Sequence, residues 1–124
     1  MSILIVDDDA GIRQLVTLFL EHKGYQAVGV ANGLEALEHL RDSQTELILL
    51  DLMMPVMNGA EFRDAQLHDS QLAAIPVVVM SAAENIDAHA PSLAADSYLP
   101  KPIDFGALIG LVERHCSQGR QIGQ

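Results

Sequence analysis

Side chains capable of chemistry stand directly after short apolar runs of this sequence. Asp7 and Asp8 follow the run ILIV, and Asp51 follows LILL. A hydroxyl, Ser81, follows VVVM, and an amine, Lys101, follows SYLP. Adjacent carboxylates repel and hold protons unless a cation is present, and hard divalent cations such as Mg²⁺ prefer oxygen ligands. Because an amine and a hydroxyl are donors that a phosphoryl group needs, the set favours an aspartate that is phosphorylated beside a divalent cation.

These residues need elements that bring them together. Five short apolar runs alternate with longer stretches of helical periodicity. Strands that are apolar on every side are buried on both faces, which predicts a parallel sheet with helices on both sides. Ligands of such sheets bind beyond the carboxyl ends of the strands. The expected strands are Ile3–Val6, Gln26–Val30, Leu47–Leu50, Val77–Met80 and Ser97–Leu99, and the expected helices are Ala10–Lys23, Gly33–Arg41, Gly59–Asp69 and one capped by Asp104.

Composition limits the class of protein. The chain has 124 residues, 49% hydrophobic and 19% charged, which suits one globular domain. We expect that domain at 1–117 and a tail or the start of a linker at 118–124. Seven basic against 17 acidic residues give a net charge of −10, which argues against direct binding of nucleic-acid phosphates. The apolar runs fall well short of the roughly 18 residues of a membrane span. Since the single cysteine, Cys116, has no partner for a disulfide, we expect a cytoplasmic protein.

Four blocks of sequence carry a family resemblance. ILIVDDD, LILLDLMMPVMNG, VVVMSAAE and YLPKP resemble the signature blocks of the receiver domain of two-component response regulators. The blocks occur in the family's order, and the similarity runs from about Ile3 to about residue 116. The resemblance implies a doubly wound (βα)5 flavodoxin-like fold, a three-layer α/β sandwich whose parallel sheet has the strand order 2-1-3-4-5.

The resemblance also implies a phosphoacceptor and a metal site. Asp51 would accept a phosphoryl group from the phosphohistidine of a sensor histidine kinase or a histidine phosphotransfer protein. Asp8 and Asp51 would bind Mg²⁺ or Mn²⁺ directly, Asp7 through water, and Met53 through its backbone carbonyl. Such a domain catalyses its own phosphorylation and dephosphorylation and is not an enzyme in the usual sense.

Further residues would hold the phosphoryl group and transmit its presence. Lys101 would pair with Asp51 at rest and with a phosphoryl oxygen afterwards, Ser81 would hydrogen-bond another oxygen, and the amide of Ala82 would help to cradle the group. Tyr98 would turn inward when Ser81 moves, which changes the surface formed by the fourth helix, fifth strand and fifth helix for an unknown output partner; a homodimer is left open. Three residues would shape the loops around the site: Pro55, Gly59 and Pro102, the last after a cis bond.

The sequence departs from the family pattern between the fourth and fifth strands. Pro91 interrupts this segment, and Ala94 stands where the family has a glycine. An internal proline removes a helix hydrogen bond, and alanine resists the left-handed conformation that glycine accepts. We therefore expect an irregular or shortened fourth helix, bent or frayed at the proline. On the third helix, Gln66 occupies a position where an apolar residue is expected, so it either softens the core or reaches a polar partner.

Two other functions are compatible with parts of the sequence. A pseudo-receiver would keep the fold as a binding module without phosphorylation. A small phosphatase of the haloacid dehalogenase type would use Asp7 as nucleophile and Asp9 as acid, but that alternative leaves DLMMPVMNG unexplained. We interpret Asp9 as a helix cap or a solvated acid.

Overall fold

The computed structural model describes residues 2–116. Residues 1 and 117–124, and with them the expected tail at 118–124, lie outside the described part, as do the side chains at 83 and 89–92. No helix in the described part is long and apolar enough to cross a membrane.

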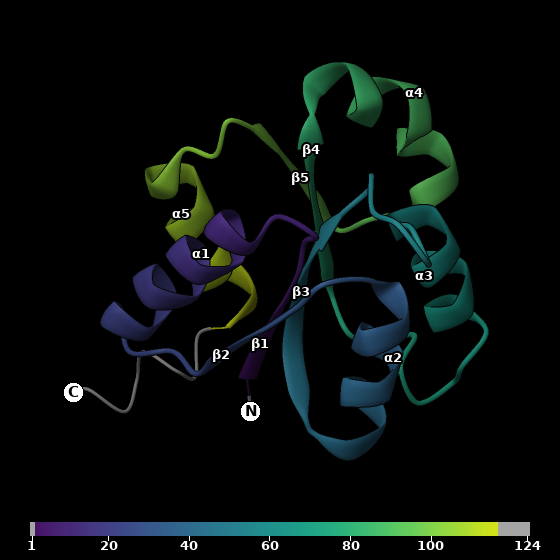
Figure 1. Ribbon diagram of the computed structural model, residues 1–124, viewed down its shortest axis with the longest axis horizontal. Helices are drawn as coiled ribbons and strands as arrows, with labels where there is room; N and C mark the ends of the chain where they lie inside the picture. Colours follow the sequence, from purple (N-terminus) through teal and green to yellow (C-terminus); the bar gives the residue numbers. More distant parts are fainter. Residues whose placement is uncertain (1, 117–124) are drawn as a thin grey trace.

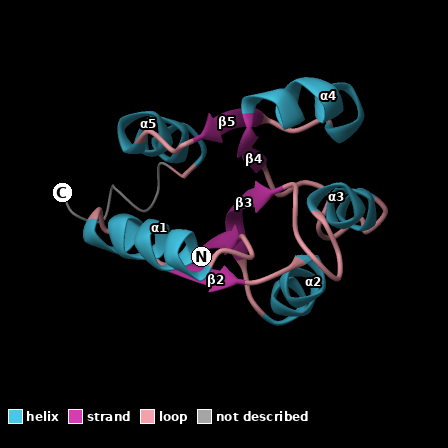
Figure 2. Ribbon diagram, turned by 45° about the horizontal axis from the view of Figure 1, so that its top comes forward, coloured by secondary structure: helices cyan, strands magenta, loops and turns pink. Residues whose placement is uncertain are grey.

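Five parallel strands form a single sheet in the order β2-β1-β3-β4-β5, which confirms the expected topology. Helices cover both faces of the sheet (Figures 1 and 2). The strands are β1 (Ser2–Val6), β2 (Ala27–Val30), β3 (Thr45–Asp51), β4 (Val77–Ala82) and β5 (Ser97–Lys101); α1 (Ala10–His22) and α5 (Phe105–His115) lie on the first face, and α2 (Gly33–Asp42), α3 (Gly59–Leu67) and α4 (Ala83–Leu93) on the second.

Burial on both faces explains the apolar runs. Successive side chains of a strand point to opposite faces, so Leu4 and Leu50 pack under α2–α4, while Ile5 and Leu49 pack under α1 and α5. All four are fully buried. The sheet therefore holds the carboxyl ends of its central strands on a rigid apolar base.

The polar residue on the third helix has polar partners. Gln66 is fully buried. Its Oε1 accepts a hydrogen bond from Nη1 of Arg63 at 2.7 Å, and its Nε2 donates to the carbonyls of Leu72 at 2.9 Å and Ile75 at 3.0 Å. Because these bonds satisfy the buried amide, Gln66 joins α3 to the segment before β4 and does not leave an unpaired group in the core.

The fourth helix is short, as expected, but it is not interrupted. Its 11 residues run without a break through position 91 to Leu93, so Pro91 does not interrupt the helix as the sequence suggested. Proline fixes φ at a helical value, and in the last turn of a helix it costs only one backbone hydrogen bond. Ala94 then adopts the left-handed conformation, with φ 50° and ψ 40°, that glycine usually takes after a helix.

A buried guanidinium holds the C-terminal end of α4. Arg63 is 5% exposed; its Nε donates to the carbonyl of Leu93 at 2.9 Å and its Nη2 to that of Ala94 at 2.6 Å. The last carbonyls of a helix have no partner within the helix. Arg63 supplies those partners, which offsets the unfavourable backbone conformation of Ala94.

Candidate functional site

Three carboxylates meet at the carboxyl end of the sheet. Oxygen atoms of Asp7, Asp8 and Asp51 all lie within 4.8 Å of one another. Asp7 and Asp8 directly follow β1, and Asp51 is the last residue of β3, as the sequence predicted. Asp7 is fully buried, Asp51 is 4% exposed, and Asp8 is exposed to solvent. Carboxylates this close repel strongly, and an oxygen cluster of this kind suits a hard divalent cation.

Lys101 reaches this cluster from β5. Its Nζ donates a hydrogen bond to Oδ2 of Asp7 at 2.9 Å and lies 3.6 Å from Oδ1 of Asp51. The expected pairing with Asp51 is thus present, but the shorter contact is to Asp7, which the sequence did not indicate. The other oxygen of Asp7 accepts a hydrogen bond from the backbone N–H of Asp9 at 2.9 Å.

The environment changes the acidity of the central groups. Burial, followed by the charge of Asp7, raises the pKa of Asp51 to about 6, although Lys101 and the N–H of Met53 act in the opposite direction. That N–H lies 3.4 Å from Oδ1 of Asp51. Burial by itself would lower the pKa of Lys101, but the hydrogen bond to Asp7 and the charge of Asp51 raise it above its ordinary value. The amine therefore stays charged beside the acids.

The loop after Asp51 depends on a glycine. A Cβ atom at Gly59 would lie 2.5 Å from the carbonyl oxygen of Asp51 and 2.8 Å from Cα of Leu52. The N–H of Gly59 donates to the carbonyl of Leu52 at 2.9 Å. The start of α3 therefore packs directly on the backbone of the acid-bearing strand, which agrees with the structural role expected of Gly59.

The same loop contains a strained residue. The N–H of Met57 donates to the carbonyl of Pro55 at 2.8 Å, which closes a three-residue turn around Val56. Val56 has a φ of 68° and is 75% exposed. A β-branched residue at positive φ is an outlier, so this turn holds backbone strain next to the acidic cluster.

The other predicted residues lie on neighbouring strand ends. Ser81 is 2% exposed and stands in the register position after Met80, the partner of Asp51. Ala82 pairs with Lys101 and precedes α4, where its side chain makes no capping hydrogen bond. Tyr98 is half-buried and packs against the cluster under α2–α4. The peptide bond between Lys101 and Pro102 is cis, as the resemblance implied.

Asp9 has the capping role that was expected of it. Its side chain accepts a hydrogen bond from the N–H of Ile12 at 3.1 Å. This bond satisfies one of the free donors at the start of α1. Asp9 is exposed and is not part of the carboxylate cluster.

Two residues at the site were not foreseen from the sequence. Arg13 donates from Nη1 to the backbone carbonyl of Asp7 at 2.8 Å. Gly33 donates its N–H to the carbonyl of Met57 at 3.0 Å, and a Cβ there would lie 2.7 Å from Cγ of Met57. The signals were present but weak: an arginine one turn into the first helix, and a glycine at the start of the second helix.

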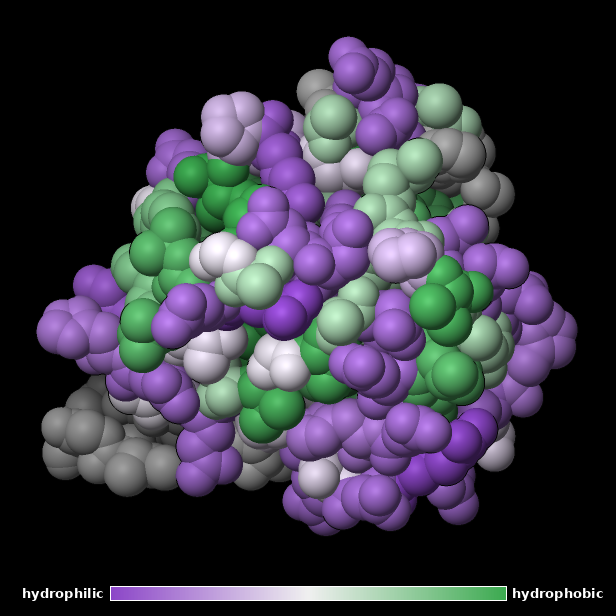
Figure 3. All heavy atoms as spheres, in the orientation of Figure 1, coloured by the Kyte–Doolittle hydropathy of each residue, from purple (hydrophilic) through white to green (hydrophobic). Residues whose placement is uncertain are grey.

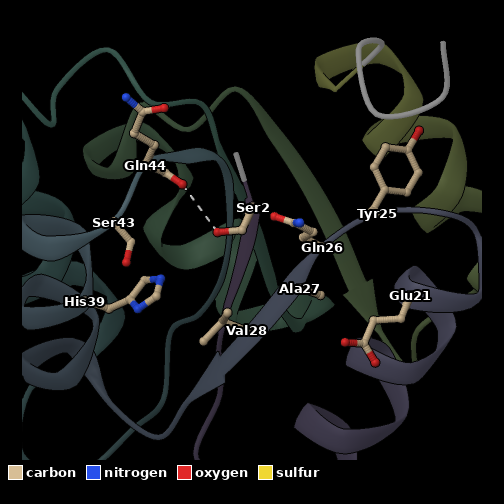
Figure 4. A pocket seen from close by; sticks show the side chains of 9 residues that line it. All are labelled: Ser2, Glu21, Tyr25, Gln26, Ala27, Val28, His39, Ser43 and Gln44. Atoms are coloured by element: carbon tan, nitrogen blue, oxygen red, sulfur yellow. Dashed lines mark hydrogen bonds between the residues drawn. The ribbon is translucent and has the colours of Figure 1, made fainter. Parts of the chain in front are cut away.

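A hollow of about 610 Å³ lies at the opposite end of the sheet (Figure 4). It surrounds the start of β2, with His39 and Ser43 on one side of that strand and Glu21 and Tyr25 on the other. None of its lining residues belongs to the carboxylate cluster. Since ligands of parallel sheets bind at the carboxyl ends of the strands, the acidic cluster is the candidate site.

Comparison with known proteins gives consistent matches. Residues 3–113 match the family described as the response regulator receiver domain. The transcriptional regulatory protein CpxR homolog of Haemophilus influenzae is 37% identical over 114 residues, which are 90% of this chain and 48% of that protein. The chain spans about half the length of the curated relatives it matches.

Solved structures show the same arrangement. The signal receiver domain of a signal transduction histidine kinase from Syntrophus aciditrophicus has a TM-score of 0.87 at 30% identity, over 94% of this chain and 89% of that chain. The chemotaxis response regulator CheY4 of Vibrio cholerae has a TM-score of 0.83 at 30% identity, over 91% of this chain and 96% of that chain.

Proposed function

Because this chain belongs to the response regulator receiver domain family, we propose that Asp51 accepts a phosphoryl group from the phosphohistidine of a kinase or histidine phosphotransfer protein. The observation that carries the proposal is that three carboxylates and one lysine meet at the carboxyl end of the sheet. A carboxylate oxygen of Asp51 forms the new bond to phosphorus as the bond from phosphorus to the histidine nitrogen breaks. The electron pair stays on the imidazole, which leaves as neutral histidine once it is protonated.

The carboxylates suit a divalent cation. Asp8 and Asp51, with the backbone carbonyl of Met53, are proposed to hold Mg²⁺ or Mn²⁺, and Asp7 to act through water. The bound cation neutralises charge on the phosphoryl oxygens. Asp7 is fully buried and already accepts hydrogen bonds on both oxygens, from Lys101 and from the N–H of Asp9. Because both of its oxygens already accept hydrogen bonds, Asp7 is better placed to contact the cation through water than to bind it directly.

The surrounding donors are proposed to hold the transferred group. Nζ of Lys101 stands 3.6 Å from Oδ1 of Asp51, close enough to pair with a phosphoryl oxygen that replaces this contact. Ser81 and the amide of Ala82 lie at the end of the next strand and at the start of α4. The free N–H groups of a helix N-terminus favour an anion. Together these groups supply positive charge and hydrogen-bond donors from β4 and β5, whereas the acids come from β1 and β3.

The phosphorylated state is proposed to reach a partner through Ser81 and Tyr98. Tyr98 lies on β5, opposite Val79 in the register, and packs against the cluster beneath α4. Movement of the Ser81 hydroxyl to the phosphoryl group changes the space next to this ring. The exposed surface that would change is formed by α4, β5 and α5.

An apolar surface beside the site suits contact with a partner protein. Apolar side chains gather over α1 and α5 on the face shown in Figure 3. Two leucines of α1, Leu15 and Leu18, are 56% and 57% exposed. Leu15 lines an apolar hollow of about 270 Å³ together with Lys101 and Phe105. Exposed apolar patches next to polar groups mark protein–protein contacts, so we assign this surface to the phosphodonor.

One experiment separates the three functions that were considered. The protein is incubated with Mg²⁺ and a small phosphodonor, and the modified residue is mapped; Asp51→Asn is the matched control. Modification of Asp51 supports the proposal. Modification of Asp7 indicates phosphatase chemistry, and no modification, together with no response to beryllofluoride, indicates a binding module that is not phosphorylated.

A further inference from the structure

Arg13 makes an unusual contact with the acidic turn. It lies in the second turn of α1, and its side chain reaches back to the carbonyl of Asp7, where Nη1 donates at 2.8 Å. The Arg13 side chain is half-buried. A hydrogen bond from a charged donor is among the stronger hydrogen bonds in proteins. The contact ties the end of β1 to the first helix.

This hydrogen bond completes the support of Asp7. The N–H of Asp7 donates to the carbonyl of Val30 at 3.1 Å, its two carboxylate oxygens accept from Asp9 and Lys101, and its carbonyl accepts from Arg13. A peptide unit is planar. Holding the carbonyl of Asp7 therefore also sets the direction in which the chain enters Asp8, the exposed carboxylate of the cluster.

A glycine provides the space through which Arg13 reaches the turn. A Cβ atom at Gly29 of β2 would lie 3.4 Å from both Cβ and Cδ of Arg13, and 3.6 Å from Oγ1 of Thr17. The stem of Arg13 thus runs directly over Gly29, in a groove of about 370 Å³ between α1 and β2 that Thr17 and Leu18 also line. A Cβ atom alone would make ordinary contacts there, but the two γ-methyl groups of a valine need further space along the stem of Arg13, and we expect them to shift the guanidinium.

From this geometry we infer that Arg13 is a positioning residue, which holds the Asp7–Asp8 turn so that its carboxylates bind a divalent cation. The inference rests on the proposed function, since it assumes that the acidic cluster binds that cation. Arg13 acts through the backbone and does not touch the cation. Residues that orient metal ligands typically alter metal affinity by about ten- to a hundredfold when changed. The lower end applies here because Arg13 acts on Asp8, the proposed direct ligand, only through the peptide unit that joins Asp7 to Asp8.

The test uses a substitution that keeps every charge. Gly29→Val displaces the guanidinium of Arg13 from its path, and valine is favoured over glycine in a strand. We expect the dissociation constant for Mg²⁺, measured on the full chain by isothermal titration calorimetry, to rise about tenfold. The thermal midpoint without Mg²⁺ should not fall. Val28→Ile, which adds volume on the opposite face of the same strand, is the matched control and should leave the dissociation constant unchanged.

The second arm tests whether the effect passes through Arg13. Arg13→Met removes the hydrogen bond, but it also removes a positive charge that repels the cation. The two effects oppose each other, so this variant is used only as the background into which Gly29→Val is introduced. Adding Gly29→Val to Arg13→Met should change the dissociation constant by less than about twofold, since the two changes share one interaction. The inference is overturned if Gly29→Val binds Mg²⁺ as the wild type does, or weakens binding equally in both backgrounds. A wild-type protein that binds no Mg²⁺ overturns the proposed function and this inference with it.

Discussion

The buried acid at the site should lower the stability of the protein at neutral pH. The pKa of Asp51 rises from 3.8 to about 6 on folding, chiefly because the side chain is buried and then because Asp7 is charged. Between these pH values the unfolded chain has released the proton and the folded chain has kept it. Stability therefore falls as the pH rises through this window, and above pH 6 the full cost is reached, about 3 kcal/mol.

Asp51→Asn removes this cost, because an amide does not ionise. We expect the free energy of unfolding of Asp51→Asn, relative to the wild type, to increase by about 2 kcal/mol between pH 4 and pH 7.5, because a small part of the cost is already present at pH 4. The hydrogen bond of Lys101 to Asp7 does not involve position 51, so we expect it to remain in this variant. The change with pH is the quantity of interest, since any constant effect of the amide cancels between the two pH values.

Urea unfolding at several pH values, in the presence of a chelator, measures this quantity. Asp87→Asn, which removes an exposed carboxylate from α4, controls for the loss of one negative charge. Its free energy of unfolding, relative to the wild type, should change much less with pH. The reasoning is refuted if the difference between Asp51→Asn and the wild type is the same at pH 4 and pH 7.5. Added Mg²⁺ should narrow the difference at pH 7.5, because it stabilises the folded wild type.

Three further substitutions test the support of the site. Gly59→Ala places a Cβ 2.5 Å from the carbonyl oxygen of Asp51 and should cost about 2 kcal/mol in urea unfolding and slow phosphorylation; an unchanged rate would contradict the packing argument. Val56→Asn should stabilise the chain by about 1 kcal/mol, because asparagine tolerates positive φ, and thermal unfolding measures it. Arg63→Met leaves the last carbonyls of α4 without donors and should cost about 3 kcal/mol, with faster amide exchange at the C-terminal end of α4; protection equal to the wild type would refute that role.

Local patterns made much of the fold predictable. Strands that are apolar on both sides, separated by amphipathic helices, predicted the parallel sheet with helices on both faces, and the strand order that the resemblance implied agrees with the structure. Asp104 caps α5 as expected, because its side chain accepts from the N–H groups at the start of that helix. The fourth helix agreed only in part: it is short, but Pro91 does not interrupt it, because a proline near the end of a helix removes only one hydrogen bond.

Contacts between residues far apart in the chain could not be predicted from such local patterns. Lys101 and Asp7 are 94 positions apart, and their 2.9 Å hydrogen bond depends on how β1 and β5 are spaced across the sheet. Arg63 and Gln66 look like poor core residues in a helical pattern, yet both are buried because backbone carbonyls from other segments accept their hydrogen bonds.

The sequence by itself determined which residues stand at the strand ends, since burial and periodicity are properties of a segment and its neighbours. The tertiary structure alone decided which of those groups touch, because a hydrogen bond depends on distances of a few tenths of an ångström between elements far apart in the chain. The acids, the lysine and the hydroxyl were thus foreseeable as a set, whereas the short contact of Lys101 with Asp7 and the support that Arg13 gives to the acidic turn were not.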